Sequence, residues 1–165
     1  MIDLQQFCGE MKAISAPWSE GDYSFATNGY ALIRVPRRSD IAENEKAPPI
    51  MGQNIGSVFG KEPAAWLGIP EFPPPADEEC AECGGDGEVR PSTPYNTYDE
   101  QECLSCGGSG KSGGINPVQI GGVYFSDRLL AKLLTLPNVK VGVFGPTNTA
   151  RIMFDGGDGL IMPIK

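Results

Sequence analysis

The chain has 165 residues, 40% of them hydrophobic and 21% charged, and a formal net charge of −8. This length and composition predict one globular domain with room for an insertion, and exclude a disordered chain. No run approaches the ~18 apolar residues of a membrane span, and the N-terminal MIDLQQFCGEMK lacks the basic start and apolar run of a signal peptide. We therefore expect a soluble cytoplasmic protein with no membrane partner. The acidic charge disfavours non-specific adhesion to nucleic acid, although it permits a local basic face.

The first predicted element is a helix over residues 2–15, where apolar side chains recur at helical spacing. A β-hairpin follows, because Asn28-Gly29 separates two apolar-rich runs at 23–27 and 30–35, and this pair favours a type I′ turn. Residues 36–50 are charged and contain proline, which predicts a loop. Further on, VFGKEPAAWLG has room for one or two helical turns, and PEFPPPADEE forms a stiff acidic segment.

Apolar periodicity stops before residue 78 and returns after residue 112. The later part begins with a strand over 118–126 that contains a Gly-Gly kink or bulge. Ser126 or Asp127 can cap a helix over 127–136, which ends before Pro137. Three further strands are predicted, at residues 139–144, 150–154 and 159–164. The interruption predicts an α+β domain formed by residues 1–77 and 113–165, with residues 78–112 as an inserted module.

The inserted module contains the sequences CAECGGDGE (80–88) and CLSCGGSGK (103–111). The spacing Cys80-x2-Cys83-x19-Cys103-x2-Cys106 suits one tetrahedral zinc ion with four thiolate ligands. The glycines let the backbone curl so that amide N–H groups point at the sulfurs. Because the module lacks apolar residues for a core of its own, metal binding would supply its folding energy. We predict one structural Zn²⁺ held by these four residues.

Other interpretations of the cysteines are weaker. Disulfides are disfavoured in a reducing compartment, and a redox dithiol usually shows a single Cys-x-x-Cys at a helix start. An iron–sulfur cluster or a simple iron site uses similar ligands and stays an alternative. Catalytic zinc is disfavoured because four thiolates leave no open coordination position. Cys8 lies on the apolar face of the first predicted helix and is expected in the core.

The absence of histidine argues against an enzyme. It removes Ser–His and Cys–His nucleophilic pairs and the commonest general base near neutral pH. A lysine or a carboxylate could still act as a base, but no nucleophile–base pair, phosphate-binding loop or open metal site is visible. The GGDG sequence at 156–159 is a turn between strands with no following helix, so it is not a phosphate cradle. We expect a non-enzymatic protein.

The paired CAECGGDG and CLSCGGSG resemble the Cys-x-x-Cys-x-Gly-x-Gly repeats in the zinc domain of DnaJ-type chaperones. That family carries four repeats and two zinc sites, whereas this chain has two repeats, enough for one ion. The resemblance covers about 35 residues, and no His-Pro-Asp motif exists in a chain without histidine. It therefore implies a zinc-stabilised hairpin, a scaffold shared by many proteins, and no chaperone role.

A second resemblance covers most of the remaining residues. The sequences YSFATNGYALIRVP (23–36), VYFSDRLLAKLLTLPNVKVGVF (123–144) and DGGDGLIMPIK (155–165) resemble, in order, segments of bacterial DNA polymerase sliding clamps. The resemblance implies a clamp-like α+β domain of two βαβββ-type halves, the first one trimmed, since no clear opening strand precedes residues 2–15. Its two helices would lie side by side, and a DNA-encircling ring would need about six copies of the chain.

The clamp resemblance makes Lys12, Arg128 and Lys132 candidates to face DNA. Arg128 and Lys132 are four residues apart and share a helix face, but the basic lining is thin, and solvated surface charge explains each residue as well. The resemblance implies a protein that acts through DNA or a replication protein. It would work in DNA replication or repair, or belong to a phage or a mobile element, and it would form a homo-oligomer.

Two alternatives stay open. The first is a protein-interaction adaptor whose zinc hairpin presents an acidic surface to a basic partner; its residues are Asp77, Glu78, Glu79, Glu82, Asp86 and Glu88. The second is a small zinc-dependent nucleic-acid reader. It would use Arg90, Lys111, and Tyr95 or Tyr98 to contact the phosphate backbone and stack on bases.

Overall fold

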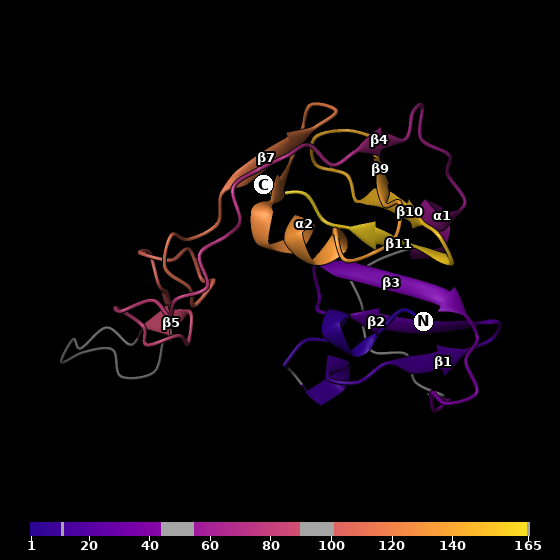
Figure 1. The fold of residues 1–165 in the computed structure, drawn as a ribbon, viewed down its shortest axis with the longest axis horizontal. Helices are drawn as coiled ribbons and strands as arrows, with labels where there is room; N and C mark the ends of the chain where they lie inside the picture. Colours follow the sequence, from indigo (N-terminus) through magenta and orange to yellow (C-terminus); the bar gives the residue numbers. More distant parts are fainter. Residues whose placement is uncertain (11, 44–54, 90–100, 165) are drawn as a thin grey trace.

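A computed structural model describes residues 1–10, 12–43, 55–89 and 101–164. Seven strands form one antiparallel sheet in the order β1-β2-β3-β11-β10-β9-β4 (Figure 1). Their bounds are β1 Trp18–Glu20, β2 Tyr23–Thr27, β3 Ala31–Pro36, β4 Leu67–Gly68, β9 Lys140–Gly142, β10 Ala150–Phe154 and β11 Gly157–Ile161. The described chain is thus α+β in class, as predicted. No helix within the described ranges is long and apolar enough to cross a membrane.

The predicted hairpin at Asn28-Gly29 is confirmed, since β2 pairs with β3 in antiparallel register. Its turn is not of type I′, because Gly29 has a positive φ of 90° but Asn28 does not. Instead the Asn28 side chain closes the turn: its Oδ1 accepts hydrogen bonds from the backbone N–H groups of Tyr30 (3.0 Å) and Ala31 (2.9 Å). Asparagine therefore acts here through its side-chain oxygen rather than through a left-handed backbone.

The first and last parts of the chain meet where β3 pairs with β11. A Cβ atom at Gly159 would lie 2.2 Å from the carbonyl oxygen of Leu32, so only glycine allows the two strands to approach this closely. Beyond β11 the backbone N–H of Met162 donates to Tyr30 (2.8 Å), and that of Ile164 donates to Tyr124 (2.8 Å). The strand predicted for 159–164 therefore begins earlier, at Gly157, and its last residues leave the sheet to join β8.

The helix predicted for residues 2–15 is wrong. The structure has two 3-10 turns in its place, η1 (Gln5–Phe7) and η2 (Lys12–Ile14), and Cys8 between them is extended, with φ −79° and ψ 153°. Gly9 explains the break: its N–H donates to the carbonyl groups of Ile14 and Thr27, both at 3.0 Å. Contacts with β2 thus replace the i to i−4 bonds that a helix would need.

Residues 118–126 form a hairpin rather than the predicted single strand. Strand β7 (Pro117–Ile120) pairs with β8 (Val123–Ser126), and Ile120 lies opposite Val123. The connecting residues Gly121 and Gly122 have φ values of 57° and 81°, so the Gly-Gly pair makes the two-residue turn that was interpreted as a kink.

The predicted helix after this hairpin is present as α2, Asp127–Leu133. Ser126 lies at its N-cap without a side-chain capping bond, whereas Asp127 Oδ1 accepts the N–H of Arg128 at 2.8 Å. The helical turns predicted within VFGKEPAAWLG, with Pro63 near their start, are misplaced: helix α1 (Ile55–Phe59) ends before Pro63, and Leu67–Gly68 form β4. Part of the predicted 36–50 loop, residues 44–50, lies outside the described residues.

The main core lies on one face of the sheet. Leu4 and Phe7 of the N-terminal segment pack there, together with the β7–β8 hairpin and the leucines of α2. On the opposite face, Val58 and Phe59 of α1 pack against a smaller cluster that contains Trp18, Leu32 and Leu160. Strand pairing and these two clusters together define the body of the protein.

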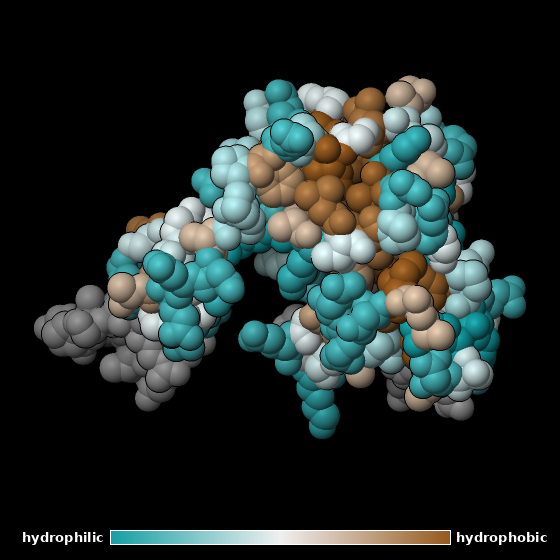
Figure 2. Space-filling view, viewed as in Figure 1, coloured by the Kyte–Doolittle hydropathy of each residue, from teal (hydrophilic) through white to brown (hydrophobic). Residues whose placement is uncertain are grey.

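Cys8 is half-buried and packs against this core, whereas the four cysteines of the two Cys-x-x-Cys sequences lie outside it. Described residues 77–89 and 101–114, here called the arm, extend away from the rest of the described chain, here called the body (Figure 1). Strands β5 (Glu88–Val89) and β6 (Gln101–Glu102) pair within the arm. Figure 2 shows that strongly hydrophobic surface gathers on the body, whereas the arm is largely hydrophilic. The arm therefore needs another source of stability.

Candidate metal centre

The four cysteines of the two Cys-x-x-Cys sequences converge in the arm. Their Sγ atoms all lie within 4.8 Å of one another, and all four side chains are buried. The Sγ atoms of Cys80 and Cys103 are 3.9 Å apart, and those of Cys83 and Cys106 are 3.8 Å apart. A disulfide needs about 2.05 Å, so these pairs are not bonded to each other, and all four cysteines are free.

The sulfur spacing fits a metal ion. Four sulfurs placed tetrahedrally about 2.3 Å from a zinc ion lie about 3.8 Å from one another. Two of the observed separations are within 0.1 Å of that value. Cys80, Cys83, Cys103 and Cys106 could therefore hold one metal ion with little rearrangement, and the cysteine set predicted from the spacing is the set that the structure brings together.

Each Cys-x-x-Cys sequence forms a tight turn, here called a knuckle. The two knuckles have equivalent backbone contacts. The N–H of Cys80 donates to the carbonyl of Gly110 at 2.9 Å, and the N–H of Cys103 donates to that of Gly87, also at 2.9 Å. Each Cys-x-x-Cys turn is thus held by the glycine that ends the other repeat. This reciprocity explains why the chain needs the whole pattern twice, with matched glycine tails, and not just two pairs of cysteines.

Two glycines allow the knuckles to pack together. A Cβ atom at Gly87 would lie 2.4 Å from the carbonyl oxygen of Gly108, and one at Gly110 would lie 2.1 Å from that of Gly85. Both residues also have positive φ, 78° and 70°. Any side chain at either position would clash with backbone and force the two knuckles apart.

Backbone donors act on the sulfurs. The N–H of Gly87 donates to Cys83 Sγ at 3.2 Å. In the metal-free thiols, burial raises the pKa of Cys103 to about 11. Burial also opposes ionisation of Cys106, but the N–H of Gly110 and the neighbouring thiols outweigh it and lower the pKa of Cys106 to about 7. In the metal-free arm, ionisation of Cys106 is therefore favoured over ionisation of Cys103.

The arm is joined to the body by two adjacent segments. Glu79 and Lys111 form an antiparallel bridge, and the N–H of Ser112 donates to Glu78 at 2.8 Å. Lys111 Nζ donates to the carbonyl of Asp77 at 3.0 Å. The chain therefore enters and leaves the arm at one place.

Arg128 of α2 fixes this junction. Its Nε donates to Gly114 (2.9 Å), Nη1 to Ala76 (2.8 Å) and Nη2 to Ser112 (3.0 Å), in each case to a backbone carbonyl. One guanidinium thus binds both the entering and the leaving segment. Sequence reasoning missed this role, because nothing in the sequence marks backbone carbonyls as the partners of an arginine.

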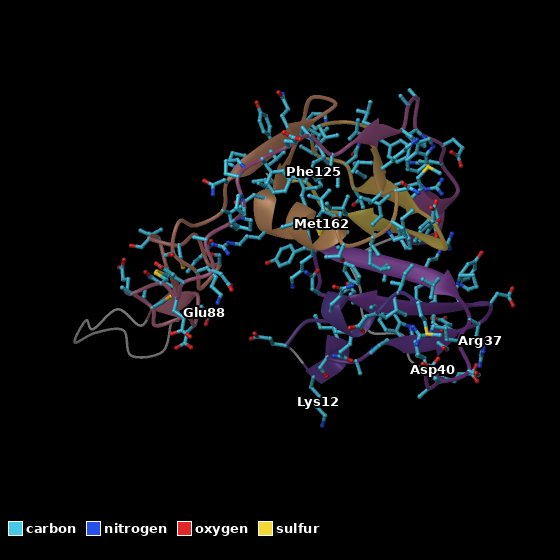
Figure 3. All side chains as sticks on the ribbon, viewed as in Figure 1. Lys12, Arg37, Asp40, Glu88, Phe125 and Met162 are labelled. Atoms are coloured by element: carbon cyan, nitrogen blue, oxygen red, sulfur yellow. The ribbon has the colours of Figure 1, made fainter. Side chains whose placement is uncertain are left out.

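The three residues predicted to face DNA have different surroundings. Lys132 is exposed on α2, and Lys12 is exposed on η2, where its side chain points away from the body (Figure 3). Arg128 is half-buried and bonded to the arm junction. A role toward DNA stays a prediction for all three. Arg90, Tyr95 and Tyr98, proposed above for nucleic-acid contact, lie outside the described residues.

Comparisons with models of known protein families, with curated proteins and with solved structures found no match. The chain is described by its own geometry: an α+β protein whose antiparallel sheet carries an arm with a buried cluster of four cysteines.

Proposed function

We propose that this chain is a non-enzymatic binding protein, in which a zinc-stabilised arm is held in a fixed direction by the body and contacts a partner macromolecule. The observation that carries the proposal is the set of three hydrogen bonds from Arg128 to the two segments of the junction. Among the described residues, the arm shares no apolar cluster with the body, because its cysteines form a separate cluster with Val89 packed against it. Arg128 therefore orients an element that adds nothing to the main core.

The proposed metal is one structural zinc ion. Four buried thiols whose sulfurs lie within 4.8 Å of one another suit Zn²⁺, and four thiolate ligands leave no open position for water or substrate. Cys80, Cys83, Cys103 and Cys106 would hold the ion, which would stabilise the knuckles in place of an apolar core. This donor set supports a structural centre and a non-enzymatic role.

A deletion tests the adaptor function. Because Glu78 and Ser112 are hydrogen bonded at the junction, residues 78–112 can be replaced by a short glycine-rich turn without separating the flanking segments. Proteins captured from cells by the full chain should be lost with this variant, while circular dichroism and thermal unfolding show that the body is intact. Capture of the same partner with equal yield by the deletion variant would refute an adaptor that works through the arm.

A clamp-like protein that acts on DNA or on a replication protein is the second candidate. Its support is the pairing of β3 with β11, which joins the two parts of the chain in one sheet. Of the two helices that the resemblance implies, the described residues form α2, whereas the 3-10 turns η1 and η2 stand in place of the first. A ring would require a defined oligomer of about six copies. Light scattering and retention on DNA at low salt test this; a strict monomer that does not bind DNA would exclude the ring.

A further inference from the structure

The two knuckles of the arm form one continuous surface, because their outer residues are bonded to each other. Ala81 and Glu82 lie between the first pair of cysteines, and Leu104 and Ser105 lie between the second pair; all four residues are exposed. The Ser105 hydroxyl donates to the carboxylate of Glu82, so the two turns are bonded to each other on the outside as well as through the cysteines. We call these four residues the knuckle surface.

Leu104 dominates the knuckle surface. Its side chain is 93% exposed, and it is the exposed large hydrophobic residue of the arm among the described positions. A single exposed leucine is common on a protein surface, but this one sits between Cys103 and Cys106, which are both fully buried. The turn that carries Leu104 is therefore fixed by the metal centre, and little conformational freedom is left to lose on binding.

The surroundings of Leu104 are strongly acidic. Residues 77–89 and 101–114 contain seven carboxylates and one lysine, and that lysine already bonds to Asp77. Four thiolates around Zn²⁺ would add further negative charge. Such a surface repels nucleic-acid phosphates and anionic lipids and attracts a positively charged protein.

We propose that the knuckle surface docks on a protein partner that has an apolar pocket, which receives Leu104, surrounded by lysine and arginine side chains. The inference rests on the proposed adaptor function and names the chemistry of its partner. Burial of Leu104 supplies affinity, and the acidic surroundings supply orientation and a salt-dependent association rate. This predicts a small interface centred on one anchor residue.

The test uses the zinc-loaded full chain, labelled with ¹⁵N, and an amphipathic peptide of lysine and leucine in helical spacing as the probe. Two control peptides keep the length: one has serine in place of leucine, and the other has glutamate in place of lysine. Leu104→Ser is the test variant. Leu134→Ser is the matched control, since Leu134 is also an exposed leucine (52%) but belongs to the body.

The lysine–leucine peptide should shift the amide resonances of Glu82, Leu104 and Ser105, and added salt should weaken its binding. Leu104→Ser should lower its affinity by about tenfold, whereas Leu134→Ser should leave it unchanged. Equal binding by Leu104→Ser, equal binding of the serine peptide, or shifts confined to the body would each overturn the inference. If partner capture from cells still depends on the arm in that case, the adaptor function stands and only this docking chemistry fails.

Discussion

Arg128 Nε donates a hydrogen bond of 2.9 Å to the carbonyl oxygen of Gly114, and thereby links helix α2 to the segment that leaves the arm. The other nitrogens of the same guanidinium reach Ala76 and Ser112. A planar cation with several fixed donors can satisfy three carbonyl groups at once, which lysine cannot do with the same geometry. Arg128 therefore bonds both segments of the junction to helix α2.

Replacement of Arg128 by methionine should free the arm from the body. Three hydrogen bonds from a charged group are lost, so the free energy of unfolding should fall by about 1–3 kcal/mol. NMR relaxation should show the arm reorienting independently, while the zinc content is unchanged. Lys132→Met is the matched control, because Lys132 is exposed on the same helix. Identical relaxation of the arm in both variants would contradict the assigned role of Arg128.

Replacement of any one of the four cysteines by serine should release the metal and disorder the arm. The reason is that, within the described ranges, the apolar cluster of the knuckles consists of the four cysteines and Val89. Amide resonances of residues 77–89 and 101–114 should collapse toward random-coil positions, while those of β2, β3, β10 and β11 persist. Loss of the body resonances as well would show that the arm is integral to the fold.

A pair of glycine variants separates steric clash from backbone strain. Gly110→Ala would place a Cβ atom 2.1 Å from the carbonyl oxygen of Gly85, whereas a Cβ atom at Gly107 would meet nothing within 4 Å. Both positions have positive φ, so each substitution carries a strain of about 1 kcal/mol. Only Gly110→Ala should also lower zinc affinity by tenfold or more, as measured by competition with a chelator. Equal affinities of the two variants would argue against tight packing of the knuckles.

An ion-pair network on the sheet face opposite the main core offers a test of the body. Asp158 on β11 accepts two hydrogen bonds from Arg34 on β3, at 2.6 and 2.9 Å, and one from Arg151 on β10, at 3.3 Å. Asp158→Asn would leave two half-buried or buried arginines without their shared carboxylate, which should cost about 2–4 kcal/mol in urea unfolding.

Glu43→Gln is the control for Asp158→Asn. Glu43 pairs with Arg37 at 3.2 Å, but its side chain is 61% exposed, and such a pair contributes at most about 0.5 kcal/mol. A similar small effect from both substitutions would mean that the Asp158 network does not hold β3, β10 and β11 together.

Features with a local cause could be predicted from the sequence. The β2–β3 hairpin follows from Asn28-Gly29 between apolar runs, and the cysteine cluster follows from two matched repeats, because both depend on residues close in the chain or on ligand chemistry. The helix at 2–15 failed for a long-range reason: Gly9 bonds to Thr27 of β2. The role of Arg128 could not be predicted from the sequence either, since its partners are backbone carbonyls whose positions depend on the folded junction.

Native mass spectrometry of the full chain, purified without added metal, measures whether one zinc ion stabilises the arm. We expect one zinc ion per chain, with Cys80, Cys83, Cys103 and Cys106 protected from alkylation until a chelator removes the metal. A metal-free chain whose arm amides remain dispersed, or a chain whose arm cysteines are joined as disulfides, would contradict it.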